Sequence, residues 1–189
     1  MPACPNFFIV TGGPGAGKTA IVERLAARGF PTVAEPGRAI LAEQAAIGGT
    51  AVHGGDAVVA FRDLMLQRDV AAFLRMADGD TDADVPVFFD RGIPDLIGYC
   101  RLIGVPVADH VRRAADTHRY SDTVFVPPPW REIYVQDALR SQDWDEAVRT
   151  YELIAAAYAE CGYRTVAVPK APVAERANFV LAAVDALGA

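Results

Sequence analysis

The sequence predicts an α/β protein built on a five-stranded parallel sheet, and three observations support this fold class. Short apolar runs alternate with longer stretches of helical periodicity, which is typical of strands joined by helices. The 189-residue chain is 52% hydrophobic and 22% charged, as in an ordinary globular protein with one sizeable core. No repeat or long linker interrupts the pattern. We therefore expect a single domain over residues 1–189.

Five apolar runs are the expected strands of this sheet. Each is four or five residues long, and most are followed by a glycine, a proline or a charged residue. In chain order the runs are Phe7–Thr11, Thr32–Glu35, Val85–Phe89, Thr123–Val126 and Thr165–Val168.

Three helices have clear start or stop signals, and a further helix is expected after the fifth strand. The first follows a glycine-rich loop and is expected to end at Gly29, a residue that adopts the left-handed conformation of helix ends easily. The second should fill Asp56–Ala77, where apolar residues recur at helical spacing. The third should run from Trp144 to Cys161, opened by Asp143 and Glu146 at the spacing of a capping box.

Charge and cysteine usage exclude several classes of protein. The net charge of -6 and the pI of about 5.0 give no overall attraction to nucleic acid or anionic membranes, so a phosphate ligand would need local positive charge. Cys4, Cys100 and Cys161 lie far apart, which disfavours a disulfide framework or a zinc site of usual spacing. The start of the chain lacks the pattern of a signal peptide, and no apolar run is long enough to span a membrane. We expect a cytoplasmic protein.

The segment GGPGAGKT, residues 12–19, matches the phosphate-binding pattern G-x-x-x-x-G-K-T. It leaves an expected strand and opens an expected helix, the context in which inward-facing N–H groups and the helix N-terminus bind phosphates. Lys18 would reach the β- and γ-phosphates, and the Thr19 hydroxyl would ligate magnesium. We expect the nucleotide, with ATP as the first candidate, to contact Gly13, Gly15, Ala16, Gly17, Lys18, Thr19 and Ala20.

The stretch VPVFFDRG places Asp90 directly after an apolar strand, where an aspartate binds Mg²⁺ beside the phosphate loop. The alternative is a surface aspartate that caps the next helix. Hydrolytic ATPases usually carry a glutamate at the next position, to polarise water, but this chain has Arg91. An arginine there suits binding of phosphoryl oxygens or of an acceptor, which favours phosphoryl transfer over hydrolysis.

Glu35 is expected at the end of the second strand, facing the same crevice, because Pro36 favours an extended conformation before it. Its carboxylate would accept the proton of an acceptor hydroxyl or orient that hydroxyl. The alternative is a structural ion pair between Glu35 and Arg38.

A small lid is expected over residues 127–143. In this lid Arg131 and Arg140 would close over the phosphates, and Trp130 or Arg131 would stack on the base. The alternative is an ordinary surface connection. Arg62, Gln67 and Arg68 on the expected second helix would either line an acceptor pocket or be solvated helix residues.

The motifs FFIVTGGPGAGKT, VAEPGRAI, FDRGIPDLIGY and the PPPW segment, in this order, resemble the small AAA-type ATPase-like domains related to the nicotinamide riboside kinase domain. The order is also similar to that of nucleoside and nucleoside-monophosphate kinases. The resemblance implies a three-layer P-loop NTPase fold with a kinase-like lid, and ATP with Mg²⁺ as ligands. It implies a site made of Lys18, Thr19, Glu35, Asp90, Arg91 and the lid arginines Arg131 and Arg140.

The leading hypothesis is an ATP-dependent kinase that acts on a hydroxyl of a nucleoside-like acceptor, or of another metabolite or an antibiotic. The alternative is a regulator or ATPase that binds ATP or GTP without phosphoryl transfer. A classical GTPase is disfavoured because the chain has no N-K-x-D segment. An oligomeric motor is disfavoured because little sequence remains for a helical lid domain after the last strand. We expect a small-molecule partner, and neither nucleic acid nor a membrane.

Overall fold

Five parallel strands form one sheet at the centre of the protein. The structure is a computed structural model, and it describes residues 4–49, 57–79, 84–134 and 143–188. The strand order is β2-β3-β1-β4-β5, so the first strand lies in the middle and pairs with β3 and β4. This confirms the predicted sheet. The strands are β1 (Phe7–Val10), β2 (Thr32–Val33), β3 (Val87–Asp90), β4 (Thr123–Val126) and β5 (Arg164–Ala167).

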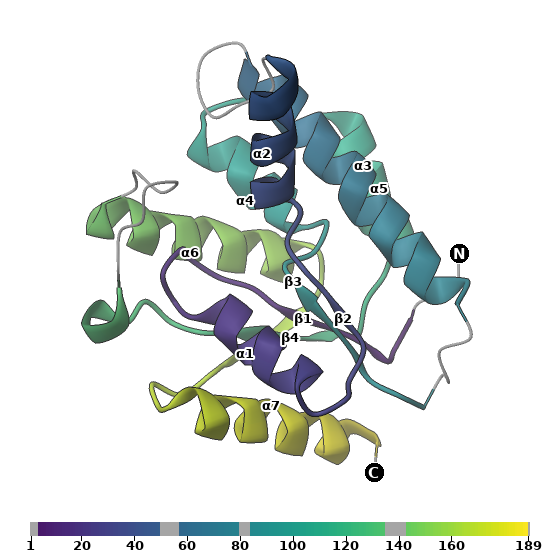
Figure 1. The fold of residues 1–189 in the computed structure, drawn as a ribbon, viewed down its shortest axis with the longest axis vertical. Coiled ribbons are helices and arrows are strands. Elements are labelled where there is room, and N and C mark those ends of the chain that lie inside the picture. Colours follow the sequence, from purple (N-terminus) through teal and green to yellow (C-terminus); the bar gives the residue numbers. More distant parts are fainter. Residues whose placement is uncertain (1–3, 50–56, 80–83, 135–142, 189) are drawn as a thin grey trace.

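Helices cover both faces of the sheet, which gives the three layers that the sequence predicts (Figure 1). One face carries α1 (Lys18–Ala26) and α7 (Val173–Gly188), which pack on each other. The other face carries α3 (Ala57–Ala77), α4 (Asp95–Leu102), α5 (Asp109–Thr117) and α6 (Trp144–Glu160). The helix α2 (Gly37–Ile47) follows β2 and packs against α3, and the short 3-10 helix η1 (Arg131–Ile133) follows β4.

The central strand divides the core into two apolar clusters. Phe7 and Ile9 point into the cluster beneath α3 to α6, whereas Phe8 and Val10 point into the cluster beneath α1 and α7. All four are buried, because successive side chains of a strand face opposite sides of the sheet. Burial of each such side chain contributes about 1.5–3 kcal/mol. The strand that leads into the glycine-rich loop is therefore held firmly on both sides.

The predicted start of α6 is confirmed, whereas α1 ends at Ala26, three residues before Gly29. The Asp143 carboxylate accepts a hydrogen bond from the Glu146 backbone N–H at 2.9 Å and caps α6. Gly29 and Gly162 follow the ends of α1 and α6 with φ of 91° and 80°. The expected first residue of α3, Asp56, lies outside the described residues.

Several boundaries differ from the prediction, and three helices were not predicted. Strand β2 ends at Val33, two residues before Glu35, and β3 extends to Asp90. The helices α4 and α5 have only eight and nine residues, too few to show a helical period over a window of about 11–18 residues. The helix α2 begins directly after Pro36, a residue that favours the start of a helix.

Cys4, Cys100 and Cys161 are all free thiols. None of the helices within the described ranges is both long and apolar enough to cross a membrane.

Candidate active site

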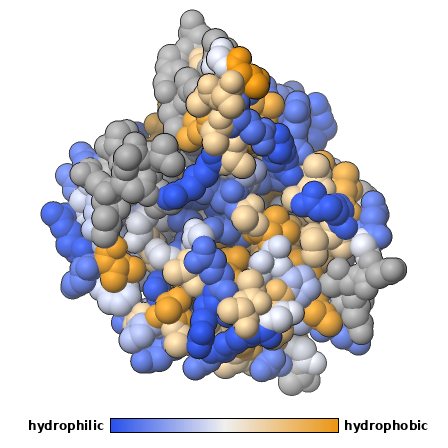
Figure 2. Space-filling view, in the orientation of Figure 1, coloured by the Kyte–Doolittle hydropathy of each residue, from blue (hydrophilic) through white to orange (hydrophobic). Residues whose placement is uncertain are grey.

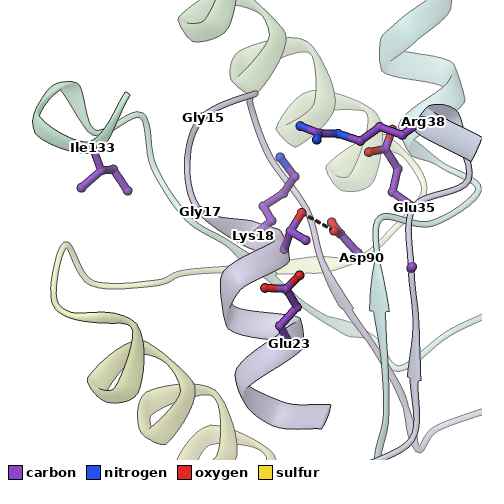
Figure 3. A pocket seen from close by; sticks show the side chains of 10 residues that line it. Gly15, Gly17, Lys18, Glu23, Glu35, Arg38, Asp90 and Ile133 are labelled. Carbon is purple, nitrogen blue, oxygen red and sulfur yellow. Dashed lines mark hydrogen bonds between the residues drawn. The ribbon is translucent and has the colours of Figure 1, made fainter. Parts of the chain in front are cut away.

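A pocket of about 480 Å³ opens at the carboxyl edge of the sheet, where β1 leads into the glycine-rich loop and β3 ends. This face of the molecule is hollowed between α2 and α1, with mainly hydrophilic side chains around the hollow (Figure 2). Ligands of open parallel sheets bind at this edge. The side chains that line the pocket include Lys18, Thr19, Glu35, Arg38, Asp90 and Ile133 (Figure 3).

The glycine-rich loop has the backbone shape of a phosphate cradle. Gly15 and Gly17 have φ of 72° and 75°, in the left-handed region that glycine adopts at little cost. Gly17 is the N-cap of α1 and offers no side chain to the free N–H groups of the first turn. These N–H groups and the positive end of the helix dipole thus stay available for an anion.

Other elements of the fold hold the loop from outside. A methyl group on Gly13 would lie 2.5 Å from the Ala147 carbonyl oxygen on α6, and one on Gly15 would lie 2.5 Å from the Tyr134 ring. A methyl group on Gly17 would lie 2.7 Å from the Arg176 guanidinium on α7. Any side chain at these three positions would therefore displace a packed neighbour.

Lys18 is almost completely buried, with 5% of its surface exposed, and its Nζ donates to the Gly13 carbonyl at 2.8 Å. Burial and the nearby Arg91 lower the pKa of Lys18, and Asp90, Glu35 and Asp95 raise it by less, so that the pKa falls to about 7. A polyphosphate beside this amine would favour its charged form. The affinity of the Lys18 site for phosphate is therefore expected to depend on pH near neutrality.

Thr19 and Asp90 meet as the sequence predicts. The Thr19 hydroxyl donates to Asp90 Oδ2 at 2.7 Å (Figure 3). The second oxygen, Asp90 Oδ1, is buried and has no hydrogen-bond partner among the described residues. A hydroxyl beside a buried carboxylate oxygen without a partner fits Mg²⁺, which prefers oxygen ligands and takes few of them from the protein. The described residues hold no cluster of three or more histidine, cysteine, aspartate or glutamate side chains for a different metal.

Arg91 connects three parts of the site. Its Nη1 donates to Asp95 Oδ1 at 2.9 Å and to the Gly12 carbonyl at 3.3 Å, and its Nε lies 3.8 Å from Glu35 Oε1. Burial lowers the pKa of Arg91, but Glu35, Asp95 and Asp90 raise it by more, so it stays above its ordinary value. This guanidinium is permanently charged and lies beside the loop and the expected base.

Glu35 lies beyond the end of β2, and its carboxylate points into the pocket together with the Arg38 side chain (Figure 3). The Glu35 side chain is 24% exposed, so an acceptor molecule can reach it. Its carboxylate forms an ion pair with Arg91, a contact that the sequence did not predict.

Asp95 at the start of α4 contacts the site residues, and the sequence analysis did not include it. Only 6% of its surface is exposed, and its carboxylate accepts hydrogen bonds from Thr11 Oγ1, the Gly92 N–H, Arg91 Nη1 and the Tyr158 hydroxyl, at 2.6 to 3.0 Å. It thereby fixes Arg91, whose own φ of 74° is unusual for a residue with a side chain. The Asp-Arg-x-x-x-Asp spacing, which allows an i,i+4 ion pair, was the available signal.

A second carboxylate missed by sequence reasoning is Asp69 on α3, which is partly buried. Burial raises the pKa of Asp69 well above its ordinary value, and Asp95 and Glu35 raise it further against the opposing effect of Arg91. Asp69 is therefore near the same charges as the expected base, although the pocket itself is lined by other residues.

The expected lid residues Trp130 and Arg131 do not line the pocket. Arg131 is exposed, and its guanidinium lies 5.0 Å from the Trp144 ring, whereas Ile133 of the same 3-10 helix lines the pocket. Arg140 lies outside the described residues. The Trp130 ring packs on Arg176 of α7.

On α3, Arg62 is buried and paired with Asp63, and Arg68 is half exposed and paired with Glu43. Gln67 is exposed. None of the three lines the described pocket. Arg68 and Gln67 thus fit the reading as surface residues, while Arg62 is a buried structural arginine.

Comparison with solved structures shows the same fold. The NadR protein, in a crystal structure in complex with NR, has a TM-score of 0.67 at 22% identity, over 88% of this chain and 46% of that one. This chain thus spans about half the length of NadR. Deoxyadenosine kinase from M. mycoides, with dCMP and dCDP bound, has a TM-score of 0.67 at 12% identity over 95% and 99% of the two chains.

Thymidylate kinase from Ehrlichia chaffeensis has a TM-score of 0.63 at 15% identity, over 97% and 100% of the two chains. These likenesses confirm the P-loop kinase-like fold. No curated protein matches the sequence. A protein family described as "AAA domain" matches residues 7–176, which include the whole glycine-rich loop, Glu35, Asp90 and Arg91. The chain therefore belongs to the AAA domain family.

Proposed function

We propose that this protein is a small-molecule kinase that transfers the γ-phosphoryl group of Mg-ATP to a hydroxyl group of a nucleoside-like or other metabolite acceptor. One observation carries the proposal: Lys18, Asp90 and Glu35, from three separate segments, line the same pocket. A nucleotide-binding lysine, a magnesium-binding carboxylate and an exposed carboxylate for an acceptor are the groups that phosphoryl transfer needs.

The loop and α1 would bind the triphosphate. Backbone N–H groups of Gly13 and of residues 15–20, together with the Lys18 amine, would surround the β- and γ-phosphates. The Thr19 hydroxyl and Asp90 would hold Mg²⁺, which when bound neutralises phosphate charge and orients the phosphate oxygens. The partnerless oxygen of Asp90 supports this assignment.

Glu35 would act on the acceptor. Its carboxylate accepts the proton of the acceptor hydroxyl as that oxygen attacks the γ-phosphorus. The bond between the γ-phosphorus and the β–γ bridging oxygen then breaks, and ADP leaves with the bridging oxygen. Arg91, fixed by Asp95, would bind the transferred phosphoryl group or the acceptor. An arginine after Asp90, rather than a carboxylate that polarises water, supports transfer over hydrolysis.

We assign Arg131 and Arg140, in the segment 127–143, to a lid that closes over the phosphates. Support for this comes from η1, because Ile133 reaches the pocket two residues after Arg131. A single domain in the cytoplasm is the matching setting, and three free cysteines fit a reducing compartment. A nucleoside-like acceptor is supported by the NadR structure, which holds NR, and by the deoxyadenosine kinase structure.

The test is phosphoryl transfer from Mg-ATP to a panel of ribonucleosides, deoxynucleosides, pyridine ribosides and hydroxylated metabolites, with products identified by mass spectrometry. The wild type should form one phosphorylated product, and Glu35→Gln should lose about 10²–10⁴-fold in kcat, the usual contribution of a general base, while it still binds Mg-ATP. Glu43→Gln is the matched control, since Glu43 is an exposed acid on α2 that pairs with Arg68.

Two results would refute the kinase assignment. Rapid ATP hydrolysis without any phosphorylated product would indicate an ATPase. Tight nucleotide binding with neither product nor hydrolysis, unchanged in Glu35→Gln, would indicate a nucleotide-dependent regulator.

A further inference from the structure

Arg176 on α7 brings a buried positive charge to the outside of the glycine-rich loop. Only 6% of its surface is exposed, and its Nη1 donates to the Ala16 carbonyl oxygen at 3.0 Å. Its guanidinium leaves no space for a side chain on Gly17, the next residue of the loop. A residue 160 positions away in the sequence thus contacts the loop just before α1 begins.

This guanidinium has an unusual environment for a buried cation. No carboxylate pairs with Arg176 among the described residues, and its Nε is buried without a hydrogen-bond partner there. Burial accordingly lowers the pKa of Arg176. By contrast, the buried Arg62 and the partly buried Arg91 each pair with an aspartate. An unpaired buried charge is costly, so its position beside a phosphate loop suggests that a bound polyanion compensates it.

The hydrogen bond to Ala16 also has a geometric consequence for the loop. In a trans peptide, the C=O of one residue and the N–H of the next point in opposite directions. All peptide bonds of the described residues are trans. Arg176 is absent from the residues that line the pocket, whereas Gly17 lines it. The hydrogen bond from Arg176 therefore holds the Ala16 carbonyl toward α7, and the Gly17 N–H of the same peptide unit points the opposite way.

The same guanidinium lies 5.6 Å from the centre of the Trp130 ring. Trp130 directly precedes η1, and four residues later the Tyr134 ring packs against Gly15 of the loop. Arg176 thus joins the loop to the segment that begins the expected lid.

We propose that Arg176 is a positioning residue for nucleotide binding: by holding the Ala16 carbonyl outward, it orients the Gly17 N–H toward the phosphates and supplies charge beside them. The inference rests on the nucleotide site of the proposed function, but it does not depend on phosphoryl transfer. It concerns the phosphates of the ligand and not the base, which gives it a specific test.

The test measures binding of three ligands by isothermal titration calorimetry: Mg-ATP, magnesium tripolyphosphate and adenosine. Arg176→Met should weaken binding of Mg-ATP and of tripolyphosphate by the same factor, about 10- to 100-fold, as for loss of a hydrogen bond from a charged donor. Adenosine binding should be unchanged. Arg176→Lys, which keeps the charge but not the planar fork, should lose less.

Arg119 provides a matched control. Its Nη1 donates to the Cys161 carbonyl at 2.8 Å, and its guanidinium lies 3.9 Å from the centre of the Tyr163 ring. It therefore makes the same two kinds of contact as Arg176, but before β4, at the amino edge of the sheet and away from the loop. Arg119→Met should bind all three ligands like the wild type. Its melting temperature shows how much stability one arginine contributes through a hydrogen bond to a carbonyl and a contact with an aromatic ring.

The outcomes separate this inference from the kinase assignment. If wild type binds Mg-ATP and Arg176→Met binds it within twofold, the inference is wrong and the kinase assignment stands. A loss confined to adenosine, or no binding of Mg-ATP by wild type, also overturns it. If Arg176→Met does not fold, the ratio of tripolyphosphate to adenosine affinity in Arg176→Lys decides. A selective loss for tripolyphosphate supports the proposal, and an unchanged ratio refutes it.

Discussion

The pKa of Lys18 gives a quantitative prediction about nucleotide binding. In the empty pocket this pKa is about 7, because the amine is buried and Arg91 is near. Phosphates around the amine would return it to the charged state, so binding takes up a proton whenever the free site lacks one. With a pKa of about 7, uptake should be about 0.1 proton at pH 6, about 0.5 at pH 7 and about 0.9 at pH 8.

The apparent affinity follows from the same titration. The dissociation constant of Mg-ATP should rise about twofold between pH 6 and pH 7, and about ninefold between pH 8 and pH 9, because only the protonated amine binds phosphate well. Calorimetry in buffers of different ionisation enthalpy measures the proton uptake directly. An uptake that stays near zero from pH 6 to pH 9 would contradict the reasoning, since Lys18 would then be charged in the empty site.

The stability of the empty protein provides an independent check with the opposite sign. The pKa of Lys18 is lower in the folded protein than in the unfolded chain, so the unfolded chain binds the extra proton between about pH 7 and pH 10.5. Stability against urea should therefore rise with pH in this range. In Lys18→Met this rise should disappear, whereas nucleotide affinity should fall. A rise of equal size in Lys18→Met would assign it to another group.

Three further predictions concern residues around the loop. Asp95→Asn removes the buried carboxylate that pairs with the partly buried Arg91 and should cost about 3 kcal/mol, or about 6–12 °C in melting temperature measured by calorimetry. Asp69→Asn should stabilise the protein at pH 7.5 but not at pH 4, measured by urea unfolding, because the raised pKa of Asp69 makes folding less favourable as the carboxyl ionises. Gly15→Ala would place a methyl group 2.5 Å from the Tyr134 ring and should abolish measurable Mg-ATP binding in calorimetry. Gly29→Ala, with a similar positive φ but nothing within 4 Å, should affect only stability, by about 1 kcal/mol.

Each of these has a clear contrary outcome. A melting temperature of Asp95→Asn within about 2 °C of wild type would show that the four hydrogen bonds contribute little. Equal stability of Asp69→Asn and wild type at both pH values would show that Asp69 ionises as in water. Normal Mg-ATP affinity in Gly15→Ala would show that the aromatic ring moves aside without cost.

The parts of the site that could be predicted are those whose residues follow a short local sequence motif. The glycine-rich loop with Lys18 and Thr19, and Asp90 at a strand end, were found because a strand, a turn and a helix each leave a sequence signal. These signals also gave the sheet and its three layers, while the short helices α4 and α5 left too little periodicity.

Asp95, Asp69 and Arg176 could not be assigned in this way, because their roles depend on contacts between distant segments. The carboxylate of Asp95 binds Thr11 and Tyr158, which lie 84 and 63 positions away. The ion pair of Glu35 with Arg91, which lies 56 positions later in the sequence, likewise depends on the pairing of β2 with β3. Apart from the i,i+4 spacing of Arg91 and Asp95, the distances of these residues along the chain do not predict which of them are in contact.

The contacts that hold the glycine-rich loop from outside also affect how a nucleotide would arrive. The helix α6, Tyr134 and Arg176 already pack against Gly13, Gly15 and Gly17 in the protein without ligand. The glycine-rich loop therefore loses its conformational entropy when the chain folds and not when the nucleotide binds. Association should then be limited by encounter rather than by rearrangement of the loop. A substitution on α6 or α7 that does not contact the nucleotide should shorten the residence time of the nucleotide, because it makes the glycine-rich loop more mobile.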